Sequence, residues 1–306
     1  MKRNILLFGA GRSSSTLINY LLDNSEKENW KISLITNSLS TAPKVLKNNC
    51  NIDIYEGDAT DLNFISKKIK LSDIVISMLP ARFHIHVAKE CLKKNKNLIT
   101  ASYISDEMLS LNDSVKKKGL LFLNECGLDP GLDHMSAMRM IHQIKNSGGQ
   151  ILGFESFTGG LVAPQSDNNP WNYKFTWNPR NVVLAGQGGA ATFIQENTYK
   201  YIPYHKLFRR TEIIEIEDYG NFEGYANRDS LKYRALYGLD KISTIYRGTL
   251  RKPGFCKAWD CLIQLGMTDD SYFIKNLEGM TNRQFTNLFL RFNPTDSVEI
   301  KLKSYL

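Results

Sequence analysis

Asn4-Ile5-Leu6-Leu7-Phe8-Gly9-Ala10-Gly11-Arg12-Ser13-Ser14 is the stretch of the sequence that decides the fold. Its first five residues contain a continuous apolar run, which is typical of a strand buried on both faces of a parallel sheet. Gly9 permits a tight turn, and Gly11 lets backbone amides approach a pyrophosphate at the start of the next helix. Ser14 replaces the third glycine of this dinucleotide-binding pattern, so the turn alone is a weak signal.

The sequence that follows strengthens this signal, because five more strand-like runs occur at residues 32–35, 52–55, 74–79, 98–100 and 120–123. Amphipathic segments of helical length lie between them at residues 64–69, 85–92 and 106–115. This alternation predicts an α/β fold, with a doubly wound Rossmann-type parallel sheet over residues 1–130. Residues 131–306 are predicted to form a mixed α/β substrate domain. A doubly wound domain that binds no dinucleotide remains the alternative.

Side chains near the carboxyl ends of these strands are the candidates for binding the dinucleotide. They are Gly9, Gly11, Arg12, Ser13, Asn37, Asp58, Leu79, Ala101 and Ser102. Residues 36–38 carry neither an acid for a ribose 2′-hydroxyl nor an arginine for a 2′-phosphate, and only Lys44 is near in sequence. NADP and NAD therefore both stay open on the residues alone. Asp58 either faces the adenosine or caps the helix that follows it.

Composition excludes several other classes of protein. The 306 residues contain 39 Lys and Arg against 31 Asp and Glu, which gives a formal net charge of +8. These cations are scattered and gather near the ends of predicted helices, so a solvated surface is favoured over nucleic-acid binding. The five cysteines show no metal-ligand spacing, and no apolar run reaches the roughly 20 residues of a membrane span. We therefore expect a cytoplasmic protein that binds no metal and no membrane.

Two further motifs carry a resemblance to a known family. Residues 102–105 and the stretch Asn124-Glu125-Cys126-Gly127-Leu128-Asp129-Pro130-Gly131-Leu132-Asp133-His134 resemble saccharopine dehydrogenases of the L-glutamate-forming type. The resemblance continues at residues 158–164, 172–177, 227–230 and 246–251, in the family's order, and covers nearly the whole chain. Members of the family typically continue for about 100 to 150 further residues. We therefore expect this chain to be shortened at its C-terminus relative to them.

The resemblance implies an NAD(P)-dependent oxidoreductase of lysine metabolism that acts on a CH–NH bond. In this reaction the imine of glutamate and 2-aminoadipate 6-semialdehyde is reduced to saccharopine, or the reverse. It implies NADP as the cofactor and an amino-acid substrate rich in carboxylates, and it leaves a homodimer open. The implied substrate residues are Ser102, Tyr103, Asp129, Gly160, Trp177, Arg228, Thr249 and Arg251. Asp129 and Tyr103 are also the catalytic candidates, because Asp129 could hold an amine or help to move a proton.

Several alternatives stay open beside this interpretation. The chain could be a dehydrogenase of another amino-acid or polyamine conjugate, such as carboxynorspermidine, or a non-catalytic nucleotide-binding module. Tyr103 is equally compatible with an aromatic packed between two lobes. Arg228 is equally compatible with a structural salt bridge to Asp229 or Glu223. His84, which follows the predicted fourth strand, is assigned to packing or to the entry of a helix.

Overall fold

The structure is a computed structural model that describes residues 2–39, 52–187 and 189–305. Lys44 therefore lies outside the described residues. Internal contacts divide the chain into two compact units, Met1–Met138 and Arg139–Leu306. This division falls within helix α6 (Leu132–Asn146), and the domain boundary at residue 130 stays a prediction.

The first unit contains a six-stranded sheet whose strands are all parallel. Its strands are β1 (Arg3–Phe8), β2 (Trp30–Thr36), β3 (Ile52–Glu56), β4 (Ile74–Ser77), β5 (Asn97–Thr100) and β6 (Phe122–Leu123). Their order is β3-β2-β1-β4-β5-β6, with β1 and β4 adjacent. This is the order of a Rossmann-type sheet, whose winding reverses between β1 and β4. The predicted doubly wound sheet is confirmed.

Alternate residues of β1 belong to two different layers of the core. Ile5 and Leu7 pack in a cluster with apolar residues of α1 (Ser15–Asp23). Leu6 and Phe8 pack in a second cluster with residues of α2 (Leu62–Lys70) and α3 (His84–Lys94). Because successive side chains of a strand point to opposite faces, helices cover both faces of the sheet. That double burial explains why the strand reads as a continuous apolar run.

The segment 106–115, predicted as one amphipathic helix, forms two short helices instead. These are α4 (Asp106–Leu109) and α5 (Asn112–Lys117). Ser110 and Leu111 between them keep dihedral angles close to the helical region, with φ of −61° and −83°. The apolar period therefore continues across the break, and it buries both Met108 and Val115. Periodicity alone does not reveal such an interruption.

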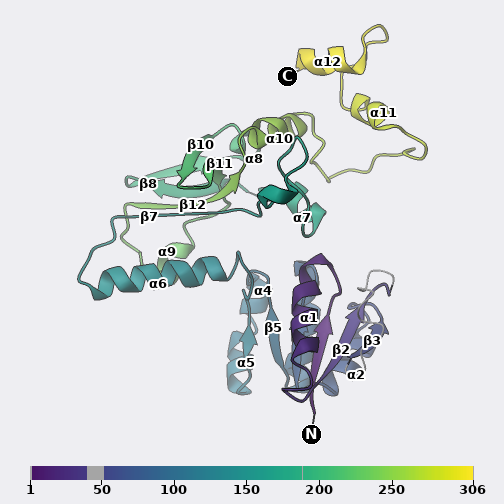
Figure 1. The fold of residues 1–306 in the computed structure, drawn as a ribbon, viewed down its shortest axis with the longest axis vertical. Coiled ribbons are helices and arrows are strands. Elements are labelled where there is room, and N and C mark those ends of the chain that lie inside the picture. Colours follow the sequence, from purple (N-terminus) through teal and green to yellow (C-terminus); the bar gives the residue numbers. More distant parts are fainter. Residues whose placement is uncertain (1, 40–51, 188, 306) are drawn as a thin grey trace. The chain divides into compact units, whose positions relative to one another are not determined.

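The second unit is built around a sheet in which β12 (Thr244–Arg251) is central. The strand order is β10-β11-β12-β8-β9, and β7 pairs with β12 in parallel while the other pairs are antiparallel (Figure 1). The other strands are β7 (Gly153–Thr158), β8 (Ala191–Gln195), β9 (Thr198–Ile202), β10 (Thr211–Ile216) and β11 (Gly220–Ala226). The predicted mixed α/β domain is confirmed.

Helices of the second unit are short apart from α6 and α10 (Phe255–Gln264). The others are α7 (Pro179–Val183), α8 (Tyr204–Leu207), α9 (Tyr233–Leu236), α11 (Asn282–Asn287) and α12 (Val298–Tyr305). Phe255 and Trp259 of α10 stack with ring centroids 5.4 Å apart, in a core that also contains Tyr225 and Tyr246. Among the described residues, no helix combines the length and the apolar character needed to cross a membrane.

Candidate functional site

The glycine turn between β1 and α1 has the geometry that a dinucleotide requires. Gly9 has a φ of +99°, and a Cβ at this position would lie 2.8 Å from the carbonyl oxygen of Met78, so glycine is needed. Apart from its chain neighbours, no described residue has an atom within 4 Å of a Cβ built on Gly11, which leaves room in front of the turn. Ser14 is buried, and its hydroxyl donates to the Gly11 carbonyl at 2.8 Å. The serine in the third position of the pattern therefore closes the turn.

The candidates that follow β1, β2 and β3 are exposed, apart from the first glycine of the turn. Asn37, directly after β2, is exposed, as are Arg12 and Ser13 after the glycine turn. The carboxylate of Asp58 accepts from the Thr60 amide at 2.8 Å, and this hydrogen bond lowers the pKa of Asp58. Asp58 does not cap the following helix. That helix, α2, is capped by Asp61, which accepts from Asn63 and Phe64.

A buried histidine that the sequence assigned to packing contacts one of the predicted site residues. His84 is 4% exposed at the start of α3. Its Nδ1 lies 2.8 Å from the hydroxyl of Ser77, and its Nε2 lies 2.8 Å from the hydroxyl of Ser102. Burial lowers the pKa of His84 from 6.5 to about 4, so the ring is neutral near pH 7. The available signal was its place at the start of the helix that follows the fourth strand.

Tyr103 and Asp129, the two catalytic candidates, contact each other. The Tyr103 hydroxyl donates to Oδ1 of Asp129. Asp129 is half-buried and Tyr103 is 37% exposed, so a substrate could reach both. The pair joins the loop after β5 to the loop before α6.

The loop that carries Asp129 is held by its own backbone. The amide of Gly127 donates to the carbonyl of Pro130 at 2.9 Å, and the amide of Gly131 donates to Asp133 at 2.8 Å. Gly131 has a φ of +149°, and a Cβ there would overlap the backbone of Gly127. Asp133 therefore anchors the start of α6.

In the second unit, Arg251 is a buried cation at the end of β12. Its side chain is 8% exposed, and its guanidinium carbon lies 4.9 Å from the ring centroid of Tyr173 and 5.3 Å from that of Phe255. Nη1 donates to the carbonyl of Leu250, whereas Nε is buried without a hydrogen-bond partner among the described residues. Glu223 pairs with Arg251 in strand register, but its carboxylate accepts from the amides of Gly254 and Cys256.

The other substrate candidates of this unit are more exposed. Thr249 lies on the same face of β12 as Arg251, two residues away, and hydrogen-bonds Tyr225. Arg228 is exposed and, within the described parts of the chain, forms neither salt bridge considered from the sequence. Its neighbour Asp229 accepts instead from the Thr192 hydroxyl at 2.7 Å. Trp177 is 43% exposed, and the space around Gly160 is open.

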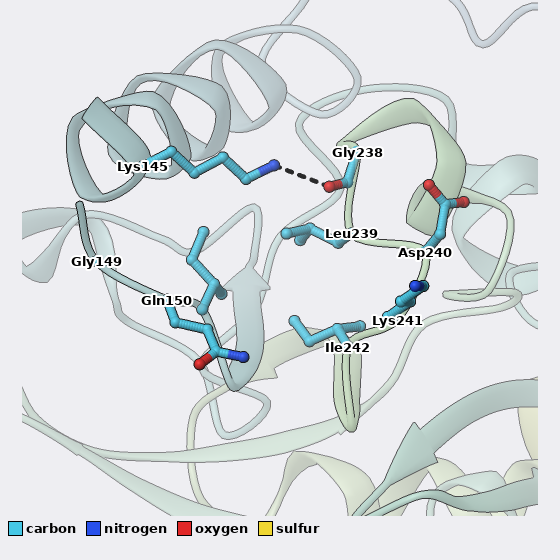
Figure 2. Close-up of a pocket in the computed structure, with 9 residues that line it drawn as sticks. Lys145, Gly149, Gln150, Gly238, Leu239, Asp240, Lys241 and Ile242 are labelled. Atoms are coloured by element: carbon cyan, nitrogen blue, oxygen red, sulfur yellow. Dashed lines mark hydrogen bonds between the residues drawn. The ribbon is translucent and has the colours of Figure 1, made fainter. Parts of the chain in front are cut away.

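The second unit contains a cavity of about 450 Å³ (Figure 2). It is lined by Lys145 of α6, by residues 149–151 and by residues 238–242, and Lys145 donates to the carbonyl of Gly238 at 2.8 Å. No predicted site residue lines it. Within the described ranges, no group of three or more His, Cys, Asp or Glu side chains is placed to hold a metal ion.

Both units match domains of one family. Residues 5–123 match the saccharopine dehydrogenase NADP binding domain, and residues 127–303 match the saccharopine dehydrogenase C-terminal domain. The chain belongs to the saccharopine dehydrogenase family. The family predicted from the sequence motifs is therefore confirmed.

Individual relatives agree with this assignment. The chain is 34% identical over 268 residues to saccharopine dehydrogenase [NADP(+), L-glutamate-forming] of Schizosaccharomyces pombe, covering 88% of this chain and 59% of that protein. It is 33% identical to the alpha-aminoadipic semialdehyde synthase of Arabidopsis thaliana, covering 88% of this chain and 27% of that protein. The chain thus spans well under two thirds of these relatives.

A solved structure shows the same fold. The apo saccharopine dehydrogenase (L-Glu forming) from Saccharomyces cerevisiae superposes with a TM-score of 0.84 and is 28% identical. The match covers 99% of this chain and 68% of that one.

Proposed function

We propose that the chain is an oxidoreductase that uses NADP and acts on the CH–NH bond of saccharopine. It would reduce the imine of glutamate and 2-aminoadipate 6-semialdehyde, or oxidise saccharopine in reverse. The fungal relatives are named saccharopine dehydrogenase [NADP(+), L-glutamate-forming], which supports this proposal. The preference for NADP over NAD rests on their names, because residues 36–38 carry no charge that selects a 2′-phosphate.

The first unit provides the groups that would hold the dinucleotide. Gly9 and Gly11 keep side-chain atoms away from the turn that ends β1, and α1 presents its amide groups beyond it. Leu79 follows β4, which is adjacent to β1 at the point where the winding reverses. When bound, the nicotinamide would supply or accept the hydride.

The observation that carries the substrate proposal is the environment of Arg251. A buried guanidinium without a carboxylate partner is costly, so the site gains free energy when an anion binds. A substrate carboxylate could take two parallel hydrogen bonds from the guanidinium. Thr249, on the same strand face, would add a hydroxyl donor. The aromatic rings of Tyr173 and Phe255 pack against the guanidinium and exclude water from it.

Hydride reduction of the imine mainly requires that the protein position the substrate and the nicotinamide and provide complementary charge. Reduction of the imine adds a hydride to carbon and leaves an amine that carries one more proton. The hydrogen-bonded pair of Tyr103 and Asp129 provides a carboxylate for a positively charged nitrogen and a phenol that can move a proton. Oriented binding and charge complementarity are the main sources of rate in such a step.

The test is oxidation of NADPH in the presence of glutamate and 2-aminoadipate 6-semialdehyde, with each substrate omitted in turn. We expect consumption that depends on both. Turnover with a polyamine-type aldehyde and amine instead would favour a carboxynorspermidine-type dehydrogenase. Tight NADPH binding without turnover of any of these substrates would indicate a non-catalytic module and contradict the proposal.

A further inference from the structure

The hydrogen bonds of His84 connect the ends of two adjacent strands of the first unit. Ser77 is the last residue of β4 and is 0% exposed. Ser102 follows β5, the neighbour of β4 in the sheet. His84 lies between their hydroxyls, with 2.8 Å at each ring nitrogen. Met78, directly after Ser77, has the carbonyl oxygen that would clash with a Cβ on Gly9. The Ser77–His84–Ser102 hydrogen bonds therefore lie next to the glycine turn.

Because the imidazole is neutral, one of its nitrogens donates a hydrogen bond and the other accepts one. The ring carries one N–H and one lone pair, so it donates to one serine and accepts from the other. If Nδ1 donated to Ser77, the hydroxyl proton of Ser77 would be buried with no acceptor, because its only hydrogen-bond partner within the described residues is His84. An unmade buried donor is costly. The favoured arrangement is therefore donation from Ser77 to Nδ1 and from Nε2 to Ser102.

We propose that His84 is a positioning residue that makes the Ser102 hydroxyl a hydrogen-bond donor to the bound ligand. With Nε2 donating to its oxygen, Ser102 keeps its own proton, and no acceptor for that proton is present among the described residues. The matching ligand group is a carbonyl or carboxylate oxygen, of the nicotinamide carboxamide or of the amino-acid substrate. The identity of this ligand rests on the proposed function, whereas the direction of the hydrogen bonds does not.

The tautomer can be measured in the protein without any ligand. In a sample labelled with ¹⁵N-histidine, the signals of His84 are those that disappear in His84→Gln. Near neutral pH we expect a protonated Nε2 and an unprotonated Nδ1. In Ser77→Ala the Nε2 tautomer should persist, because a protonated Nδ1 would have no acceptor there, while the Nδ1 signal should move as its hydrogen bond is lost. A protonated Nδ1 in the wild type, or a doubly protonated ring, would overturn the proposal.

Ligand binding tests the role of Ser102. Ser102→Ala and His84→Leu should each weaken NADPH binding, or raise the KM of the substrate, by about threefold to tenfold, the effect of one hydrogen bond. The double variant should be no worse than Ser102→Ala alone. His84→Gln, whose amide can replace the Nε2 donor, should recover most of the loss. His86→Gln on the same helix is the matched control and should change nothing.

The two ligand sources give different results. A loss in dinucleotide affinity without substrate would assign the carboxamide, and a change confined to the substrate KM would assign the substrate oxygen. Additive effects of Ser102→Ala and His84→Leu, or normal binding and KM in both, would overturn the positioning role. If the wild type binds no dinucleotide at all, the proposed function fails and the ligand role of Ser102 fails with it, while the NMR result still decides the tautomer.

Discussion

In the first unit the buried His84 finds a hydroxyl at each ring nitrogen and is neutral, whereas in the second unit the buried Arg251 has no carboxylate partner among the described residues. The histidine is satisfied by the fold itself, because two paired strands bring its partners together. The arginine is stabilised mainly by aromatic rings and one carbonyl. We infer that the first arrangement orients a group in the free protein, and that the second is completed by a ligand.

The largest expected effect is that of Arg251→Met. The variant loses the buried partner of a substrate carboxylate, so kcat/KM should fall about 30- to 5000-fold, which corresponds to about 2–5 kcal/mol. The free energy of unfolding of the ligand-free protein should stay the same or rise, because an unpaired buried charge is replaced by an apolar side chain. Steady-state kinetics and urea denaturation measure the two quantities.

Arg209→Met is the control for this substitution. Arg209 is exposed and pairs with Asp260 at 2.8 Å, so its loss should change stability by less than about 1 kcal/mol and leave the substrate KM unchanged. A marked loss of stability in Arg251→Met would show that the arginine serves the fold rather than a ligand.

The pH dependence of stability should report on His84. Its pKa is 6.5 in the unfolded chain and about 4 in the folded one, so the unfolded state takes up the proton first as the pH falls. The contribution of His84 to the free energy of unfolding is fully present above pH 6.5. It is lost as the pH falls from 6.5 to about 4, by up to about 3 kcal/mol. Urea midpoints across this range measure it. His84→Gln should flatten the curve, and an unchanged curve in that variant would contradict the burial of a neutral ring.

Substitution of the two glycines separates folding from binding. Gly9→Ala should destabilise the protein by about 1–3 kcal/mol, because φ is +99° and the added Cβ would meet Met78. Gly11→Ala has open space and an extended φ of −75°, so its melting temperature should be nearly unchanged while NADPH binding weakens. Equal destabilisation by both substitutions would contradict this difference.

The smallest effect is expected for Tyr103→Phe. Removing its hydroxyl breaks the hydrogen bond to Asp129 and should lower kcat/KM by an amount that corresponds to about 0.5–1.5 kcal/mol of activation free energy. The free energy of unfolding should change by less than about 0.5 kcal/mol. Tyr20→Phe, at an exposed position of α1, is the control. An equal effect of the two substitutions on kcat/KM would remove Tyr103 from the catalytic candidates.

The fold was predictable where a single pattern controls it. Strands buried on both faces are apolar throughout, and the runs at β1 and β4 identify them directly. The break between α4 and α5 was not predictable, because the residues at the break keep the helical period. Of the two roles left open for Asp58, capping is excluded, because Asp61, a second acid three residues later, is the N-cap of α2.

The site was predictable where a local motif controls it, and less so where distant residues meet. Gly9 and Gly11 follow from the turn itself. The role of His84 depends on Ser77 and Ser102, which come together only because β4 pairs with β5. Among the described residues Arg251 has no acid partner, and this likewise depends on Glu223, whose carboxylate accepts from the amides at the start of α10. Neither fact can be read from spacing along the chain.

Calorimetric titration of saccharopine into the wild type and into Arg251→Met, each saturated with NADP, compares the affinity of the substrate with and without the buried guanidinium. We predict that the wild type binds saccharopine and that the variant binds it at least about 30-fold more weakly. Equal affinities in the two proteins would contradict the assignment of Arg251 to a substrate carboxylate.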